Sequence, residues 1–333
     1  LRFRNGALDF ALPEVHCDLD AQGNPIGFTK RASTEAYNLI EECMLAANRV
    51  VARKIFAARL PGIFRVHDGP SEEQWTRMAE ELRALGHSDT PGYAHDLNRI
   101  ARAVLGRPDQ YITTLTLLRN MKRAVYANEC RPHFGLGFKH YAHFTSPIRR
   151  YPDLVLHRIL IGLEEGRKHP ACSAAEIAKL AVHCSETERE SAELEIQSIL
   201  TKRIRYYAAR LEAGETGPFQ GTIISLNPKG LIVELQDTLQ QGLLPYSALG
   251  HGRYAVSDDG FRAASRQGGA YRLGQPVEVA LATVDERLKR IDFFLPGALR
   301  PGRHKHIDKQ RGKVRNKRSK HPERSGASRR PTK

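Results

Sequence analysis

Apolar residues recur every three to four positions through the first two thirds of the chain, whereas apolar and polar residues alternate after Gly217. The first period is typical of amphipathic helices and the second of half-buried strands. Ser71 and Gln74 have the spacing of a helix capping box. We therefore predict an α+β protein, in which a helix-rich part precedes a β-domain. The expected helices run from Ser33 past Val51 and over about 71–85, 94–105, 109–127, 152–165 and 173–212.

Two segments of the helix-rich part have the pattern of strands instead. Residues 1–30 alternate weakly around a turn at residues 20–25, which predicts a short hairpin at a sheet edge. Residues 133–138 are apolar and punctuated by glycine, and we interpret them as a further strand. Within the helix at 109–127, helical spacing predicts a buried stripe of Ile112, Leu115, Leu118, Met121 and Val125.

The β-domain has the pattern of a five-stranded OB-type barrel with one long insertion at about 247–274. Such barrels commonly bind single-stranded nucleic acid, and aromatic side chains stack on the bases. Phe219, Tyr246 and Tyr254 are the candidates for this stacking. Ordinary packing within the barrel is the alternative, and it is favoured more for Phe219 than for the two tyrosines. The expected strands span 218–225, 230–236, 241–246, 275–285 and 289–295.

The first long helix combines an apolar stripe with a neighbouring polar strip. Glu41 and Asn48 share a face with Leu45, and Glu42 lies at its flank. This strip is either the solvent face of the helix or the edge of a functional site. The apolar stripe, which we expect to be buried, consists of Ala36, Leu39, Ile40, Cys43, Met44, Ala47, Val50 and Val51.

The segment at 143–153 (HFTSPIRRYPD) holds the densest group of conformationally special residues in the chain. Ser146 can cap a helix, and Pro147 suits the first helical position. Pro152 cannot lie inside a regular helix. The pattern therefore predicts a single turn, a break at Tyr151 and a new helix from Pro152.

Arg149 and Arg150 accompany this helix start and suggest a phosphate-binding site. Free backbone N–H groups at a helix start attract anions. A guanidinium group can also bind two phosphate oxygens at once. The alternative is an ion pair between Arg149 and Asp153, one turn apart, that only holds the loop. The residue pattern leaves both interpretations open.

Four potential metal ligands precede and overlap this segment: Cys130, His133, His140 and His143. Their spacings are similar to those of zinc sites. Pro132, the intervening strand and the lack of a second cysteine pair make zinc the weaker hypothesis.

Composition restricts the class of protein and its compartment. The apolar content of 41% supports sizeable cores, and no run of 18 apolar residues predicts a membrane span. The five cysteines are scattered and odd in number, which indicates reduced thiols and a cytoplasmic location. The chain starts with Leu and has no signal peptide, so we interpret it as a piece of a longer protein.

The net charge of +15 is concentrated at the C-terminal end. Residues 297–333 contain 14 Lys and Arg but only 2 Asp and Glu, whereas the other 296 residues contain 38 and 35. Such a tail is expected to be disordered and to suit a polyanion. Nucleic acid is the favoured partner, and a tail that only aids solubility is the alternative.

Four runs of the helix-rich part resemble the RNB catalytic domain of the bacterial ribonuclease R family: 39–48 (LIEECMLAAN), 117–124 (LLRNMKRA), 133–137 (HFGLG) and 141–154 (YAHFTSPIRRYPDL). Residues 217–295, with YRLG at 271–274 and KRIDF at 289–293, resemble that family's RNA-binding OB barrel. The resemblance implies the C-terminal half of an RNB domain at 1–165, a connecting helical segment at 166–213, an OB-fold domain at 214–297 and a disordered Lys/Arg-rich tail at 298–333.

The resemblance also implies an activity and its partners. Members of this family hydrolyse single-stranded RNA from the 3′ end to nucleoside 5′-monophosphates. They hold Mg²⁺ with a cluster of aspartates, and no such cluster occurs in this sequence, so the ligands are expected outside this chain. We therefore expect an exoribonuclease when the protein is intact, and a non-catalytic RNA-binding fragment or remnant as the alternative. The expected partners are single-stranded RNA and, through the tail, the ribosome or RNA-turnover proteins; a monomer is expected.

Residue by residue, the resemblance assigns Arg149 to the arginine that contacts the phosphate at the scissile end. Glu41 and Glu42 match a segment whose glutamate reaches the catalytic cavity, and Glu42 is the preferred candidate. Two departures in the barrel, NPKGLI at 227–232 and Pro245 before Tyr246, remove two expected base-stacking partners. The further candidates for RNA contacts are Asn48, His67, Tyr141, Thr145, Ser146, Arg150, Phe219 and Tyr246.

Overall fold

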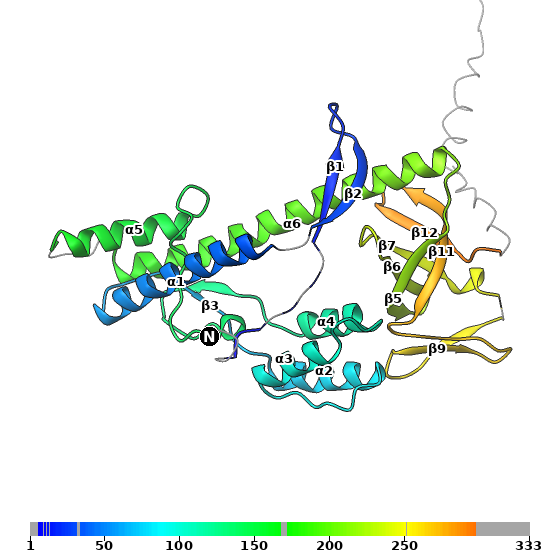
Figure 1. The fold of residues 1–333 in the computed structure, drawn as a ribbon, viewed down its shortest axis with the longest axis horizontal. Helices are drawn as coiled ribbons and strands as arrows, with labels where there is room; N and C mark the ends of the chain where they lie inside the picture. The colour runs from blue at the N-terminus through cyan, green and yellow to red at the C-terminus, as the bar shows by residue number, and fades with distance from the viewer. Residues whose placement is uncertain are drawn as a thin grey trace, which may run out of the picture.

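The computed structural model describes residues 6–297, apart from residues 9, 11, 13, 32–33, 168–171 and 251. The tail expected at 298–333 and Ser33 therefore lie outside the described residues. Figure 1 shows a helical part at one end and a β-barrel at the other, joined by the long helix α6. The helices are α1 (Glu35–Ala57), α2 (Glu72–Ala84), α3 (Ala94–Ala103), α4 (Gln110–Arg119), α5 (Tyr151–Glu164) and α6 (Ala174–Glu212).

Helices α1, α5 and α6 pack around one apolar core. α1 contributes Ile55, α5 contributes Leu156, and α6 contributes Ile177, all essentially inaccessible to solvent. α5 begins at Tyr151, one residue before the predicted start, with a proline in its first turn. α6 begins with the capping box of Ser173 and Glu176 and continues for 39 residues. These three helices form the rigid frame on which the candidate site is built.

The outer side of α1 differs from the sequence prediction. The stripe that was expected to be buried is largely exposed, with Leu39 64%, Ile40 59% and Val50 62% accessible. The buried side instead includes Leu45 and Asn48. Helical spacing identifies apolar sides of a helix but does not show which side meets a core. α1 is apolar on two sides, and the described residues cover only one.

Helices α2, α3 and α4 enclose a second, smaller core. The capping box of Ser71 and Gln74 is confirmed at the start of α2. α4 ends at Arg119, earlier than predicted, because the buried Asn120 donates from Nδ2 to Thr116 O and to Glu81 Oε2. Of the predicted stripe, Ile112 is confirmed as buried, whereas Leu115, Leu118, Met121 and Val125 are only partly buried. The other buried residues of α4 are Thr113, Thr114, Thr116 and Leu117.

Residues beyond α4 form a strand rather than more helix. β4 (Val125–Ala127) pairs antiparallel with β3 (Phe64–Val66), which satisfies backbone groups that lie in the core. The strand expected at 133–138 is wrong as well. A 3₁₀ turn, η2 (Phe134–Leu136), occupies it, and Gly137 at φ 64° reverses the chain so that His133 pairs with Phe138.

The predicted N-terminal hairpin is confirmed as β1 (Glu14–Leu19) and β2 (Pro25–Arg31). Among the described residues these strands pair only with each other, so the hairpin does not lie at the edge of a larger sheet. It packs on α6, where the rings of Phe28 and Tyr206 meet edge to face at 5.2 Å. The Lys202 ammonium group also donates to Gly23 O.

The five strands predicted after Gly217 are confirmed, and they close into a barrel of order β11-β12-β7-β6-β5. Ile223, Leu231, Val279 and Phe293 are essentially fully buried in its core. The strands are β5 (Phe219–Asn227), β6 (Gly230–Leu235), β7 (Gln241–Pro245), β11 (Pro276–Asp285) and β12 (Arg290–Phe294).

The long insertion between β7 and β11 contains its own structure. After the 3₁₀ turn η3 (Tyr246–Ala248), the strands β8 (Tyr254–Val256), β9 (Arg262–Ser265) and β10 (Ala270–Arg272) form a three-stranded antiparallel sheet. Among the described helices, none combines the length and apolar character that a membrane span requires.

The barrel is attached to the helical part at α4. The Tyr111 hydroxyl bonds to the buried Glu234 carboxylate, and Arg119 Nη1 donates to Ile224 O at 3.1 Å. Gly274 has φ 78°, and a Cβ there would lie 2.8 Å from Leu85 Cδ2 and 3.1 Å from Ile112 Cγ2, so a larger residue would strain the backbone and displace the Leu85 side chain. These contacts fix the barrel relative to the helices.

Candidate phosphate-binding site

The turn at 146–150 is the centre of the candidate site. Ser146 O accepts hydrogen bonds from Arg149 N at 3.3 Å and from Arg150 N at 3.1 Å, which closes a single turn before α5. Ser146 does not cap this turn with its side chain; its backbone N–H instead donates to Asp153 Oδ1 at 2.8 Å. The predicted turn is therefore confirmed, but the break lies at the extended Arg150 instead of Tyr151, and the capping role of Ser146 is wrong.

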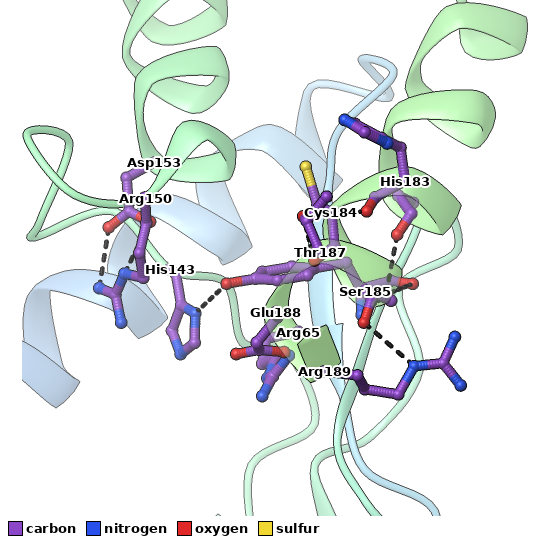
Figure 2. Close-up of polar contacts among 12 residues, drawn as sticks. Arg65, His143, Arg150, Asp153, His183, Cys184, Ser185, Thr187, Glu188 and Arg189 are labelled. Carbon is purple, nitrogen blue, oxygen red and sulfur yellow. Dashed lines mark hydrogen bonds and ion pairs between the residues drawn. The ribbon is translucent and has the colours of Figure 1, made fainter. Parts of the chain in front are cut away.

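Arg150 is bound to Asp153 in a bidentate ion pair. Arg150 Nε donates to Asp153 Oδ2 and Nη2 to Oδ1, both at 2.9 Å. Figure 2 shows this pair at the start of α5, and the Asp153 side chain is fully buried. The alternative of an Arg149–Asp153 pair is wrong, because the planar fork of Arg150 occupies both carboxylate oxygens. Arg150 was proposed from the sequence as an RNA contact. Its guanidinium group instead binds the Asp153 carboxylate within the protein.

Arg149 is the exposed cation of the turn. It forms no ion pair within the described part of the chain. Its neighbour Ile148 is fully exposed, so the tip of the turn projects into solvent. A guanidinium group without a carboxylate partner retains its capacity for phosphate oxygens. Of the two adjacent arginines, Arg150 therefore binds a carboxylate of the protein, whereas Arg149 is exposed and can bind a phosphate.

Asn48 holds the start of the turn from α1. Its Oδ1 accepts from Phe144 N at 2.8 Å and from Thr145 N at 3.2 Å, and its Nδ2 donates to Tyr141 Oη at 3.1 Å. Asn48 is only 3% exposed and Tyr141 only 4%. Both residues, candidates for RNA contacts from sequence, therefore lie inside the protein and bind its own backbone and side chains. The Thr145 hydroxyl is buried and lacks a hydrogen-bond partner among the described residues.

His143 lies beneath the turn and is kept neutral. Its Nδ1 shares a hydrogen bond of 2.9 Å with the Tyr126 hydroxyl. Burial lowers the pKa of His143 to about 2, and the positive charges of Arg150, Arg65 and Arg149 act in the same direction. Burial likewise raises the pKa of Tyr126 to about 12. The region below the turn therefore gains no charge from these two groups near neutral pH.

Arg65 is a third arginine near His143, and its guanidinium group also forms an ion pair within the protein. It pairs with Glu188 of α6 at 2.5 Å, and its guanidinium lies 4.7 Å above the ring of Tyr126. Figure 2 shows Arg65 and Glu188 close together below Thr187 of α6. Of the three arginines around His143, Arg149 is thus the one without a carboxylate partner.

His67 is bonded to backbone at both ring nitrogens. Nε2 donates to Lys122 O at 2.8 Å, and Nδ1 accepts from Gly135 N at 3.1 Å. Burial lowers the pKa of His67, and of its neighbour His133 to about 3. His67 therefore joins the turn η2 to β3 and has no free nitrogen for RNA.

Glu41 and Glu42 both lie on the exposed N-terminal half of α1. Their exposure permits contact with a ligand, but the preference for Glu42 stays a prediction. In the barrel, Phe219 packs on Tyr207 at 5.8 Å and lies under the Arg210 guanidinium. Tyr246 is 9% exposed and stacks on Tyr254 at 5.2 Å. The packing alternative therefore describes these aromatic rings better than a free base-stacking surface.

No group of three or more metal-ligating side chains occurs among the described residues. Cys130 Sγ and His140 Nδ1 are 3.2 Å apart, but His133 and His143 bond elsewhere. Burial raises the pKa of the Cys130 thiol to about 11, which disfavours the thiolate that zinc requires. The described residues therefore do not fit a zinc site, nor a magnesium site of their own.

Comparisons with known proteins identify the family of the part of the chain that contains this turn. Residues 1–165, which contain the turn, α1 and α5, match the RNB domain. Residues 1–165, about half of the chain, belong to the RNB family. RNB members that are similar over most of this chain are ribonuclease R of Aquifex aeolicus, 34% identical over 88% of this chain, and that of Escherichia coli, 34% identical over 91%.

This chain covers 42% of the length of the Aquifex ribonuclease R and 38% of the length of the Escherichia ribonuclease R. Its fold is that of Mycoplasma genitalium RNase R, solved in complex with ribose-methylated single-stranded RNA. The TM-score is 0.79 at 23% identity, over 88% of this chain and 47% of that one. The family resemblance and the fold expected from sequence are confirmed.

Sequence reasoning missed several residues that build the site: Asp153 as partner of Arg150, His157, and Tyr126. His157 Nε2 donates to Phe144 O at 2.9 Å, and its ring stacks on Phe144 with centroids 4.0 Å apart. Helical spacing places Asp153 and His157 on one side of α5, four residues apart, which is the signal that could have linked them.

Proposed function

We propose that this chain is part of a 3′→5′ exoribonuclease that hydrolyses single-stranded RNA to nucleoside 5′-monophosphates. The observation that carries the proposal is Arg149: it is exposed, has no carboxylate partner in the described residues, and stands on a turn fixed by Asn48 and Asp153. The RNB match and the RNA bound by the Mycoplasma relative support RNA as the polyanion.

In this proposal Arg149 binds the phosphate at the scissile position. Negative charge develops on the phosphoryl oxygens during hydrolysis, and a fixed guanidinium stabilises that charge. Because Asn48 and Asp153 already hold the turn, little reorganisation is needed during the reaction. Glu42, on the exposed part of α1, is proposed to lie near the terminal nucleotide.

The described residues do not supply a magnesium site, so Mg²⁺ is proposed to be held by residues outside this chain. When bound, it would supply the Lewis-acid chemistry of phosphodiester hydrolysis. The exposed apolar side of α1, with Leu39, Ile40 and Val50, is consistent with further polypeptide that covers it in the intact domain. We propose the division of this chain at 1–165, 166–213, 214–297 and 298–333.

The proposal is tested with Arg149→Ala in a protein that also carries the remaining part of the RNB domain. Turnover should fall by about 10²–10³, the effect of removing one donor to a developing negative charge. Affinity for RNA should change little. An equal and small loss of turnover and affinity would show that Arg149 is not a catalytic residue.

A non-catalytic RNA-binding fragment is the second candidate, and the lack of a metal cluster among the described residues favours it for this chain alone. The purified 333-residue chain should bind single-stranded RNA without releasing mononucleotides when Mg²⁺ is added. Magnesium-dependent release, lost again in Arg149→Ala, would contradict that expectation and place a complete site in the chain itself.

A further inference from the structure

Three consecutive residues at the start of the Arg149 turn are each held by a side chain from a neighbouring helix. Asn48 of α1 accepts from Phe144 N and Thr145 N, at 2.8 and 3.2 Å. Asp153 of α5 accepts from Ser146 N at 2.8 Å. The segment belongs to no strand or helix, so these side chains replace the backbone ladder that would otherwise fix it.

The two anchoring helices are themselves rigidly joined. Val51 and Ile55 of α1 pack in the same core as Val155 and Ile159 of α5, and all four are 7% exposed or less. Close-packed side chains permit little relative displacement of the two helices. Asn48 lies one turn before Val51, and Asp153 lies two residues before Val155. The two anchors are therefore fixed points on either side of the turn.

The anchors are oriented by groups of their own. The Asn48 amide donates to the Tyr141 hydroxyl at 3.1 Å, which determines that its oxygen faces the loop. The Asp153 carboxylate is oriented by the bidentate contact with Arg150. Because the buried Asn48 amide and the buried Asp153 carboxylate make these hydrogen bonds, each has few alternative positions.

We propose that Asn48 and Asp153 are positioning residues for Arg149, and that Arg150 acts on the reaction only through Asp153. The inference rests on the proposed role of Arg149 but concerns residues that would not touch RNA. It replaces the sequence-based assignment of Asn48 and Arg150 to RNA contacts. The structural cost of losing an anchor should appear locally, at residues 144–146, before it appears elsewhere.

The first test is amide hydrogen exchange, followed residue by residue by NMR on the purified chain. In Asn48→Leu, exchange at Phe144 and Thr145 should accelerate about tenfold more than at Tyr126, since one net hydrogen bond is worth about a factor of ten. The Tyr126 amide is a suitable reference because it donates to Ser185 Oγ, away from the turn. Tyr141→Phe removes only the group that orients Asn48 and should give a smaller change in the same direction.

Asn98→Leu is the matched control, because Asn98 is a buried asparagine on α3 that donates to Ala7 O at 2.7 Å. It should leave the ratio of exchange between Phe144 and Tyr126 unchanged, even if the whole chain is destabilised. If Asn48→Leu also leaves that ratio unchanged, Asn48 does not order the turn and the proposal is overturned.

The second test measures turnover in the protein that carries the remaining part of the domain. Asn48→Leu should lower kcat about 10- to 100-fold, as expected for a misplaced catalytic group, with KM changed less than about threefold. In the Arg149→Ala background the same change should add less than about threefold, because the two residues act as a unit. Fully additive effects would overturn the positioning role. A normal kcat in Arg149→Ala would instead refute the proposed function of Arg149, whatever the exchange experiment shows.

Discussion

Arg150, not Arg149, forms the ion pair with Asp153. The two arginines are adjacent in sequence and chemically identical, yet Arg150 binds a fully buried carboxylate and Arg149 faces solvent. The difference arises from backbone direction: Arg150 is the residue that precedes α5, three positions before Asp153, and its side chain follows the first turn of the helix. Substitutions at the two positions should therefore affect different properties.

Arg150→Met should destabilise the fold. Among the described residues it leaves only the Ser146 amide as a donor to the buried Asp153 carboxylate. An uncompensated buried charge costs about 3–5 kcal/mol in unfolding free energy. Urea denaturation of the purified chain measures this loss. Arg149→Met is the matched control and should change the unfolding free energy by no more than about 0.5 kcal/mol, as exposed substitutions do. Equal effects at the two positions would contradict the division of roles.

Stability should fall as the pH falls below about 6.5. Unfolded His143 takes up a proton near its ordinary pKa of 6.5, whereas burial keeps it neutral in the folded chain down to a pKa of about 2. Between these values the unfolded state binds more protons, so acid favours unfolding by up to about 1.4 kcal/mol per pH unit for each such histidine. His133, with a pKa lowered to about 3, contributes in the same direction.

The pH dependence is measured by denaturant unfolding between pH 5 and 6.5, above the range in which most carboxylates titrate, about 4. His143→Gln should reduce the slope by about half a proton at pH 6.5 and by nearly one proton at pH 5. His183→Gln, at an exposed position on α6, is the matched control. A slope that is the same in His143→Gln and in the unmodified chain would show that His143 is protonated equally in both states.

The outer side of α1 should tolerate polar substitution. Leu39→Lys with Val50→Lys replaces side chains that are more than 60% exposed, so each change should alter the unfolding free energy by about 0.5 kcal/mol or less. The double variant should also bind less of a hydrophobic dye and self-associate less, because the exposed apolar area is smaller. A cooperative loss of more than about 2 kcal/mol would mean that this side is covered within the chain itself.

Removal of residues 298–333 should flatten the salt dependence of RNA binding. Each phosphate contact with single-stranded RNA adds about 0.7 to the slope of log affinity against log salt concentration. Equilibrium binding of a single-stranded oligonucleotide at several salt concentrations measures the slope with and without these residues. An identical slope would favour the alternative in which the basic residues only aid solubility.

Local sequence patterns were sufficient to predict the six described helices, the N-terminal hairpin and the barrel, but not β4, η2 or the sheet in the insertion. The five strands of the barrel and the capping box at Ser71 follow from local patterns, in which each residue's preference agrees with its neighbours'. The turn and break before α5 follow from two prolines with fixed backbone geometry. The motif around Arg149, together with three further runs of the helix-rich part and the barrel, likewise indicated the family.

Which arginine of the motif is bound to a carboxylate and which is exposed depends on tertiary contacts. Asn48 and Thr145 are 97 positions apart, and no local pattern shows that the amide of one binds the backbone of the other. The buried side of α1 and the partner of Asp153 depend in the same way on where distant helices pack. Local spacing sets the faces of an element, whereas burial and hydrogen-bond partners are properties of the assembled core.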